Sequence, residues 1–156
     1  MNFTRVVAFT VAIVGLALGS SFAARAQDDN WVVKTGQLSV AETVDKLTNA
    51  IEMTGGKVAA VIDHAAAAEK AGMDLAPTTL VIFGNPKIGT PLMQENQQIG
   101  IDLPMRVLVW QDGNDTKVGY IKPEMLASWY GISADAPSIQ TMIGALTKLT
   151  DGAIAP

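Results

Sequence analysis

The sequence predicts a single domain of the α+β class. Two adjacent strand patterns, at 106–111 and 117–121, are joined by a turn-forming segment and followed by two helical patterns. Adjacent strands between helices are typical of an α+β layer rather than a doubly wound parallel sheet. Residues 27–156 have the length of one domain, and no segment rich in proline, glycine and serine divides them.

The segment 1–26 is predicted to be a secretory signal peptide that precedes the domain. Arg5 supplies a positive charge, 6–18 is an uncharged and largely apolar run, and 24–26 (Ala-Arg-Ala) has the small-x-small pattern of a cleavage site. The apolar run is too short for a spanning helix, which needs about 20 residues. We therefore expect cleavage after Ala26, a periplasmic or secreted protein, and no stable membrane anchor.

Charge and cysteine content argue against several classes of function. The chain has 11 basic and 15 acidic residues, and removal of Arg5 and Arg25 leaves 9 basic residues and a net charge of −6. Because basic clusters that neutralise phosphates are absent from 27–156, nucleic acid is not an expected partner. The absence of cysteine excludes disulfides, thiolate metal sites and a cysteine nucleophile.

The first strand and helix are predicted by residue type and spacing. The segment 31–35 has the aromatic and β-branched content of a strand. Ser39 and Glu42 then form a capping-box pattern at the start of a helix. Apolar residues at spacings of 4, 3 and 4 give that helix one apolar face, and Gly55 ends it.

Two more strands and a short helix are expected next. The apolar run 58–62 predicts a short buried strand, and the alanine-rich segment 65–71 predicts a brief helix. The strongest strand pattern is 78–83, and 84–86 (Gly-Asn-Pro) ends it in a turn.

A third helix is expected to begin with Thr90 as its N-cap and Pro91 at its first position, and to run to about Gln98.

The remaining elements are a hairpin and two helices. The strands 106–111 and 117–121 flank a predicted hairpin loop of four or five residues at 112–115. A short helix is expected from Pro123, and 138–149 has the apolar stripe of an amphipathic helix.

Four short motifs of this sequence, in this order, resemble motifs of the family known as domain of unknown function 302. They are Ile62-Asp63-His64-Ala65, Phe83-Gly84-Asn85-Pro86-Lys87, Gly89-Thr90-Pro91-Leu92-Met93 and Ile101-Asp102-Leu103-Pro104. The resemblance covers roughly residues 31–131. It implies a TATA-binding-protein-like fold, an antiparallel sheet with helices packed on one side.

The resemblance also implies a homodimer. The apolar residues Ile99, Ile101 and Leu103 favour this expectation, since they lie in a segment interrupted by glycine and proline that is not expected to be wholly core. One departure is visible at Tyr130, where relatives commonly carry a basic or histidine side chain before the glycine.

His64 is the first candidate site residue, because a single histidine leaves one side chain that titrates near neutral pH without a perturbed pKa. Two interpretations stay open. His64 either binds a ligand or metal at the end of the sheet, or has a structural role, in which it satisfies a buried backbone group or caps the following helix. Met73 and Met93 are the partners expected if the site holds copper or haem, since imidazole and thioether ligate both.

The segment after the strand 78–83 offers a second candidate. It lacks the spacing of a phosphate-binding loop. Asn85, Lys87 and the backbone N–H groups after Thr90 are nevertheless expected to form a small polar rim that attracts anions.

These observations favour an exported, non-enzymatic module that binds a small ligand or a partner near His64. The alternatives are a periplasmic copper- or haem-binding protein and a structural module whose apolar surface makes a dimer.

Overall fold

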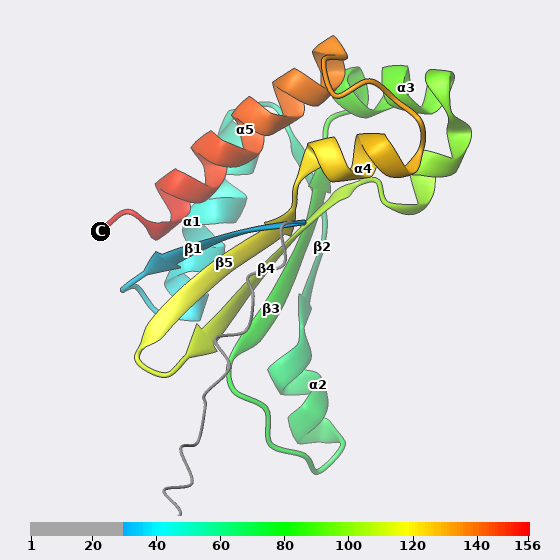
Figure 1. The fold of residues 1–156 in the computed structure, drawn as a ribbon. Helices are drawn as coiled ribbons and strands as arrows, with labels where there is room; N and C mark the ends of the chain where they lie inside the picture. Colours follow the sequence, from blue (N-terminus) through cyan, green and yellow to red (C-terminus); the bar gives the residue numbers. More distant parts are fainter. Residues whose placement is uncertain (1–29) are drawn as a thin grey trace, which may run out of the picture.

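Five strands form one antiparallel sheet in the computed structural model, which describes residues 30–156 (Figure 1). The strands are β1 (Trp31–Gly36), β2 (Lys57–Asp63), β3 (Thr78–Gly84), β4 (Met105–Asp112) and β5 (Asp115–Ile121). They lie in the order β1-β5-β4-β3-β2, and each pairs with its neighbours antiparallel. The predicted α+β class is confirmed, while the predicted signal peptide lies outside the described residues.

The helices pack on one side of the sheet, as the family resemblance implies (Figure 1). They are α1 (Val40–Met53), α2 (His64–Lys70), α3 (Pro86–Glu95), the 3₁₀ turn η1 (Gln97–Ile101), α4 (Pro123–Trp129) and α5 (Pro137–Ile154). The long helices α1 and α5 contact each other and the strands, and α4 packs on α5. Within 30–156, no helix combines the length and hydropathy needed to cross a bilayer.

The core lies between the sheet and the helices α1 and α5. Alternate residues of the central strands, among them Val81, Val107 and Val118, are fully buried on the face toward these helices. They meet the helix side chains Leu47 and Leu146 in one hydrophobic cluster. Successive strand residues point to opposite faces, so the alternate set forms a second face that none of the described helices covers.

The capping box at the start of α1 is confirmed. The Glu42 N–H donates to Ser39 Oγ (3.2 Å), and the Ser39 N–H and Oγ–H donate to Glu42 Oε2 (3.0 and 2.6 Å). These bonds to the Ser39 side chain and backbone hold the pKa of Glu42 below its ordinary value. Such reciprocal bonds satisfy two backbone donors that the first helical turn leaves free.

The hairpin turn is tighter than predicted. Asp112 pairs directly with Asp115, so the loop has two residues, Gly113 and Asn114, and the expected loop of four or five residues is wrong. Gly113 has φ of +62°, a conformation that the tight two-residue turns require. The first strand of the hairpin thus continues one residue further than predicted, and the second begins two residues earlier.

The start of the third helix was also mispredicted. Asn85, not Thr90, is the N-cap of α3, because its backbone is extended and its Oδ1 accepts from the Lys87 N–H (3.0 Å). Pro86 then takes the first helical position, and Pro91 lies inside the helix. Both Asn-Pro and Thr-Pro satisfy the sequence rule for a helix start. The helix uses the earlier pair and ends at Glu95, where η1 follows.

The segment expected to contribute to a dimer has mixed burial. Ile99 is fully buried in the core, whereas Ile101 is 80% exposed and Leu103 is half-buried. The expectation that this segment is not wholly core is therefore correct, although Ile99 does not contribute to an exposed surface.

Candidate functional site

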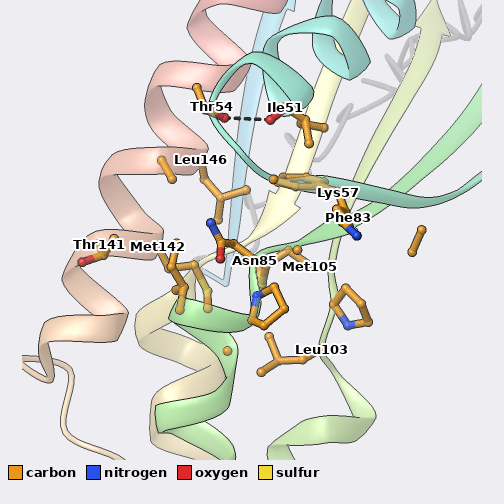
Figure 2. Close-up of a pocket in the computed structure, with 18 of the residues that line it drawn as sticks. Ile51, Thr54, Lys57, Phe83, Asn85, Leu103, Met105, Thr141, Met142 and Leu146 are labelled. Atoms are coloured by element: carbon orange, nitrogen blue, oxygen red, sulfur yellow. Dashed lines mark hydrogen bonds between the residues drawn. The ribbon is translucent and has the colours of Figure 1, made fainter.

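A pocket of about 560 Å³ lies at the end of the sheet where α1 stops and α3 starts (Figure 2). One wall is the segment 54–59 at the start of β2, and a second is Phe83 with the N-terminal half of α3. The loop 103–105 forms a third wall, and α5 closes the pocket with Met142, Leu146 and their neighbours. The size falls within the range of about 300–1,000 Å³ typical of small-molecule sites.

Short glycine contacts explain how the chain segments approach each other here. A Cβ at Gly56 would lie 3.0 Å from Ile51 Cγ2, and a Cβ at Gly84 would lie 3.1 Å from Pro104 Cβ. Either contact is tighter than ordinary packing, so a larger residue would push the β2 segment or the 103–105 loop away. These two glycines therefore let two walls of the pocket pack closely.

A polar cluster holds the third wall in place. Tyr130 Oη donates to Asp102 Oδ2 (2.5 Å), and Arg106 pairs with the other oxygen of the same carboxylate. Asn96 Nδ2 donates to the Tyr130 carbonyl (2.9 Å) and ties η1 to the end of α4. Asp102 directly precedes Leu103, so the cluster fixes the loop that lines the pocket. Tyr130, the residue that departs from the family pattern, is thus a hydrogen-bond donor here.

The pocket is mainly apolar, and most of its polar side chains are already bonded. Thr54 Oγ1 donates to the Ile51 carbonyl (2.9 Å) and Thr141 Oγ1 to the Pro137 carbonyl (2.8 Å). Asn85 caps α3 and donates to the Gly55 carbonyl (3.4 Å). Among the described residues, Lys57 and Thr90 make no hydrogen bond or ion pair through their side chains.

The structure brings together two of the three residues that were predicted to form the polar rim. Asn85 and Thr90 line the pocket, whereas Lys87 follows Asn85 on α3 and is not a lining residue. Met93, predicted as a metal partner, also lines this pocket. These three lining residues come from α3 and its cap.

His64 lies elsewhere, as the exposed first residue of α2. Asp63 is the N-cap of this helix and accepts from the Ala66 N–H through its side chain (2.8 Å), so the interpretation of His64 as the cap is wrong. His64 lines neither this pocket nor a second pocket of about 470 Å³ beside α2.

The structure does not bring the three predicted metal ligands to one pocket. Met73 lines the second pocket, Met93 lines the first, and His64 lines neither. The Met93 sulfur lies 3.4 Å from an ideal Cβ on Gly100, in van der Waals contact with η1. Within 30–156, no group of three or more His, Asp or Glu side chains is placed to hold a metal ion.

Sequence reasoning missed most of the pocket residues. Lys57 follows the Gly55-Gly56 turn, and Phe83 and Met142 occupy apolar positions that read as ordinary core. The segment Leu103-Pro104 is part of a motif that resembles the family, and it contributes to the third wall of the pocket. The remaining residues come from distant segments, and no local pattern predicts that they meet.

A family model described as "Domain of unknown function DUF302" matches residues 31–150, which is most of the chain. The chain belongs to the DUF302 family. The match extends beyond Gly131, where the resemblance in the sequence ended, and includes most of α5. The matched region therefore contains every wall of the pocket.

The curated relatives that this DUF302 chain matches in sequence are longer proteins. A protein named "Fluoride-specific ion channel FluC 1" from Brucella suis biovar 1 is 39% identical over 131 residues, which cover 80% of this chain and 51% of that one. A protein of the same name from Brucella abortus biovar 1 is also 39% identical, with 80% and 48% covered. The chain thus spans about half the length of the curated relatives it matches.

A solved structure has the same fold. The "crystal structure of uncharacterized conserved protein DUF302 from Bacillus stearothermophilus" matches with a TM-score of 0.73 and 21% identity, and the match covers 81% of this chain and 99% of that one. At this identity, the likeness shows the fold of the DUF302 family.

Proposed function

We propose that this protein is an exported, non-enzymatic module that binds a small, largely apolar molecule in the pocket between β2, α3 and α5. The observation that carries the proposal is the pocket itself, with its size and its apolar lining. Buried surfaces of Met93, Met105 and Met142 add flexible thioether side chains, which adapt to ligands of irregular shape.

The lining also supports binding rather than catalysis. Lys57 is the one ionisable side chain among the lining residues, which include no carboxylate and no imidazole. General acid–base catalysis uses paired groups of matched pKa, most often histidine or carboxylates. A pocket of this composition is suited to holding a molecule.

The experiment is calorimetric titration with 1-decanol, a neutral molecule with an apolar body, on the wild type and on two variants of α5. Ala145→Phe places a ring at a lining position, and Gly144→Phe places the same ring at the neighbouring exposed position. We expect saturable binding of one decanol per chain to the wild type and to Gly144→Phe, and none to Ala145→Phe. Absence of saturable binding to the folded wild type contradicts the proposal.

The Brucella relatives bear on the setting in which such a module works. They carry a segment similar to this chain within longer proteins that are named as ion channels. This supports a domain that operates beside other parts of a protein or beside a partner. Export remains part of the proposal and is tested by the intact mass of the protein from its source, which should correspond to a chain that starts at Gln27.

Copper or haem binding remains a separate proposal for His64, with Met73 and Met93 as partners. The positions of these residues favour it less than the apolar pocket, since the three do not line one pocket. A visible absorption spectrum of the natively purified protein tests it, because bound haem or oxidised copper absorbs visible light.

We also propose that two copies of the chain associate through the uncovered face of the sheet. Trp31 and Trp110 lie over Gly119, where an ideal Cβ would be 2.9 Å from Trp110 Cζ3 and 3.4 Å from Trp31 Cε3. The absence of a side chain at Gly119 thus lets both rings approach the backbone of β5 closely. Leu80 and Leu108 pair across neighbouring strands on the same face and extend this apolar surface.

A further inference from the structure

We propose that the ligand of the pocket is an amphiphile with a single negative charge, such as a medium-chain carboxylate, and that Lys57 at the pocket binds its head group. This inference rests on the proposed function and adds the chemical class of the ligand. Its basis is the combination of an apolar cavity with one free cation among the lining residues.

Lys57 has no partner of its own. It is exposed at the first position of β2, and its ammonium group makes no hydrogen bond or ion pair to any residue of 30–156. Its state differs from that of Lys34, which pairs with Asp151 (2.5 Å), and of Lys117, which pairs with Asp115 (3.3 Å). Lys57 therefore offers three donor hydrogens to a bound molecule.

The other polar side chains of the lining are less suited than Lys57 to bind a negatively charged head group. Thr54 and Thr141 each donate their one hydroxyl hydrogen to a backbone carbonyl. The Asn85 amide uses one of its two hydrogens in the bond to the Gly55 carbonyl. Among the described residues, the hydroxyl of Thr90 and the second hydrogen of the Asn85 amide are the further uncommitted donors of the lining. One cation with few neutral donors matches the single charge of a carboxylate better than the roughly two charges of a phosphate monoester.

The net negative charge of the whole chain does not oppose the binding of a carboxylate in the pocket. Residues 27–156 carry a net charge of −6, but charges farther away than about 8 Å are largely screened at physiological ionic strength. The lining contains no carboxylate. Lys57 is therefore the one charge that the lining itself supplies, and it favours an anion over a cationic amphiphile.

The test compares decanoate with 1-decanol, two probes with the same number of carbon atoms and different head groups. Calorimetric titrations are made at low and high salt on the wild type, Lys57→Gln, Lys57→Arg and Lys70→Gln. Lys70 lies in the last turn of α2 and lines neither pocket, so Lys70→Gln is a matched control for the loss of one positive charge.

We expect Lys57→Gln to weaken decanoate binding by about two- to fivefold, the range of an exposed ion pair, and to leave decanol binding unchanged. Lys57→Arg should retain the affinity for decanoate, Lys70→Gln should match the wild type, and high salt should reduce the wild-type preference for decanoate.

The outcomes separate the two proposals. If decanol and decanoate bind equally well and Lys57→Gln changes neither affinity, the pocket binds apolar molecules and the inference about Lys57 is overturned. If neither probe binds to the folded wild type, the proposed function and this inference both fail.

Discussion

At the scale of single residues, the Asp102 carboxylate organises the wall of the pocket. One oxygen accepts from Tyr130 Oη, and the other pairs with Arg106. The carboxylate thus joins the loop before β4 to the end of α4, two segments that are separated in the sequence by the whole hairpin. The pKa of Tyr130 is raised, first because its hydroxyl donates to Asp102, and then by desolvation and by the negative charge of the same carboxylate.

This hydrogen bond predicts a pH-dependent contribution to stability. The folded state raises the pKa of Tyr130 above its ordinary value of about 10, so the contribution is fully present below pH 10 and is lost as pH rises through the folded-state pKa. Tyr130→Phe removes the hydroxyl. We expect this variant to unfold at a lower denaturant concentration than the wild type at pH 8, and the difference to shrink above pH 10.

Chemical denaturation at pH 8, 9, 10 and 11 measures the difference in the free energy of unfolding between the two proteins. The comparison cancels the titration of other groups, which both proteins share. A difference that stays constant up to pH 11 contradicts a role for the Tyr130 hydroxyl as a donor to Asp102.

At the scale of helices and strands, the sequence predicts best the elements whose patterns lie within one short segment of the chain. The capping box at Ser39 and the apolar stripe of α1 lie within one helix, and both are confirmed. The start of α3 was mispredicted because two polar-proline pairs compete, and tertiary contacts decide between them. Asn85 Nδ2 also reaches the Gly55 carbonyl (3.4 Å), a contact between segments that local rules do not contain.

The site was less predictable than the fold for the same reason. Asn85, Thr90 and Met93 were identified because they lie in one short segment with a recognisable pattern. Lys57 and Met142 meet them only after the sheet and α5 have formed. His64 attracted attention because the chain has one histidine, and rarity says nothing about where a side chain lies.

The cap of α3 gives a prediction at this scale. Asn85→Ala removes the acceptor for the Lys87 N–H, and loss of an N-cap costs about 1 kcal/mol. We expect the melting temperature to fall by roughly 3–6 °C and the affinity for decanol to fall with it, because α3 forms one wall of the pocket. Thermal denaturation and calorimetry measure the two effects.

Asn85→Ser is the matched control, since serine retains an acceptor oxygen and is an equally good N-cap, and it lacks the amide that donates to the Gly55 carbonyl, as alanine does. This variant should melt close to the wild-type temperature. If Asn85→Ala and Asn85→Ser are destabilised equally, the cap is not what holds the start of α3.

At the scale of the whole molecule, the fold has one covered and one uncovered face of the sheet. The helices α1 and α5 bury the first face, and none of the described helices covers the second (Figure 1). Five strands about 4.8 Å apart with a rise of about 3.3 Å per residue give a face of roughly 500 Å² in projection. Two such faces together approach the area of about 1,000 Å² that a specific interface needs.

The composition of the uncovered face suits a second copy of the chain. Its apolar centre has Trp110 beside Gly119, and the basic side chains nearest to this centre on β4 and β5 are held by neighbouring carboxylates, Arg106 by Asp102 and Lys117 by Asp115. Neutralised charges at the rim and aromatic side chains at the centre are typical of protein interfaces. A two-fold axis through the face would bring the same patch of both copies together.

Trp110→Glu tests this interface. The substitution places a charge at the centre of the uncovered face, where it would be buried without a partner in a dimer, so we expect the variant to be monomeric. Trp129→Glu is the matched control, since Trp129 is 50% exposed on α4, which packs on α5 away from that face. Light scattering at micromolar concentration should give the mass of two chains for the wild type and Trp129→Glu, and of one chain for Trp110→Glu. A monomeric wild type, or a Trp110→Glu variant that stays dimeric, shows that the uncovered face is not the contact between copies.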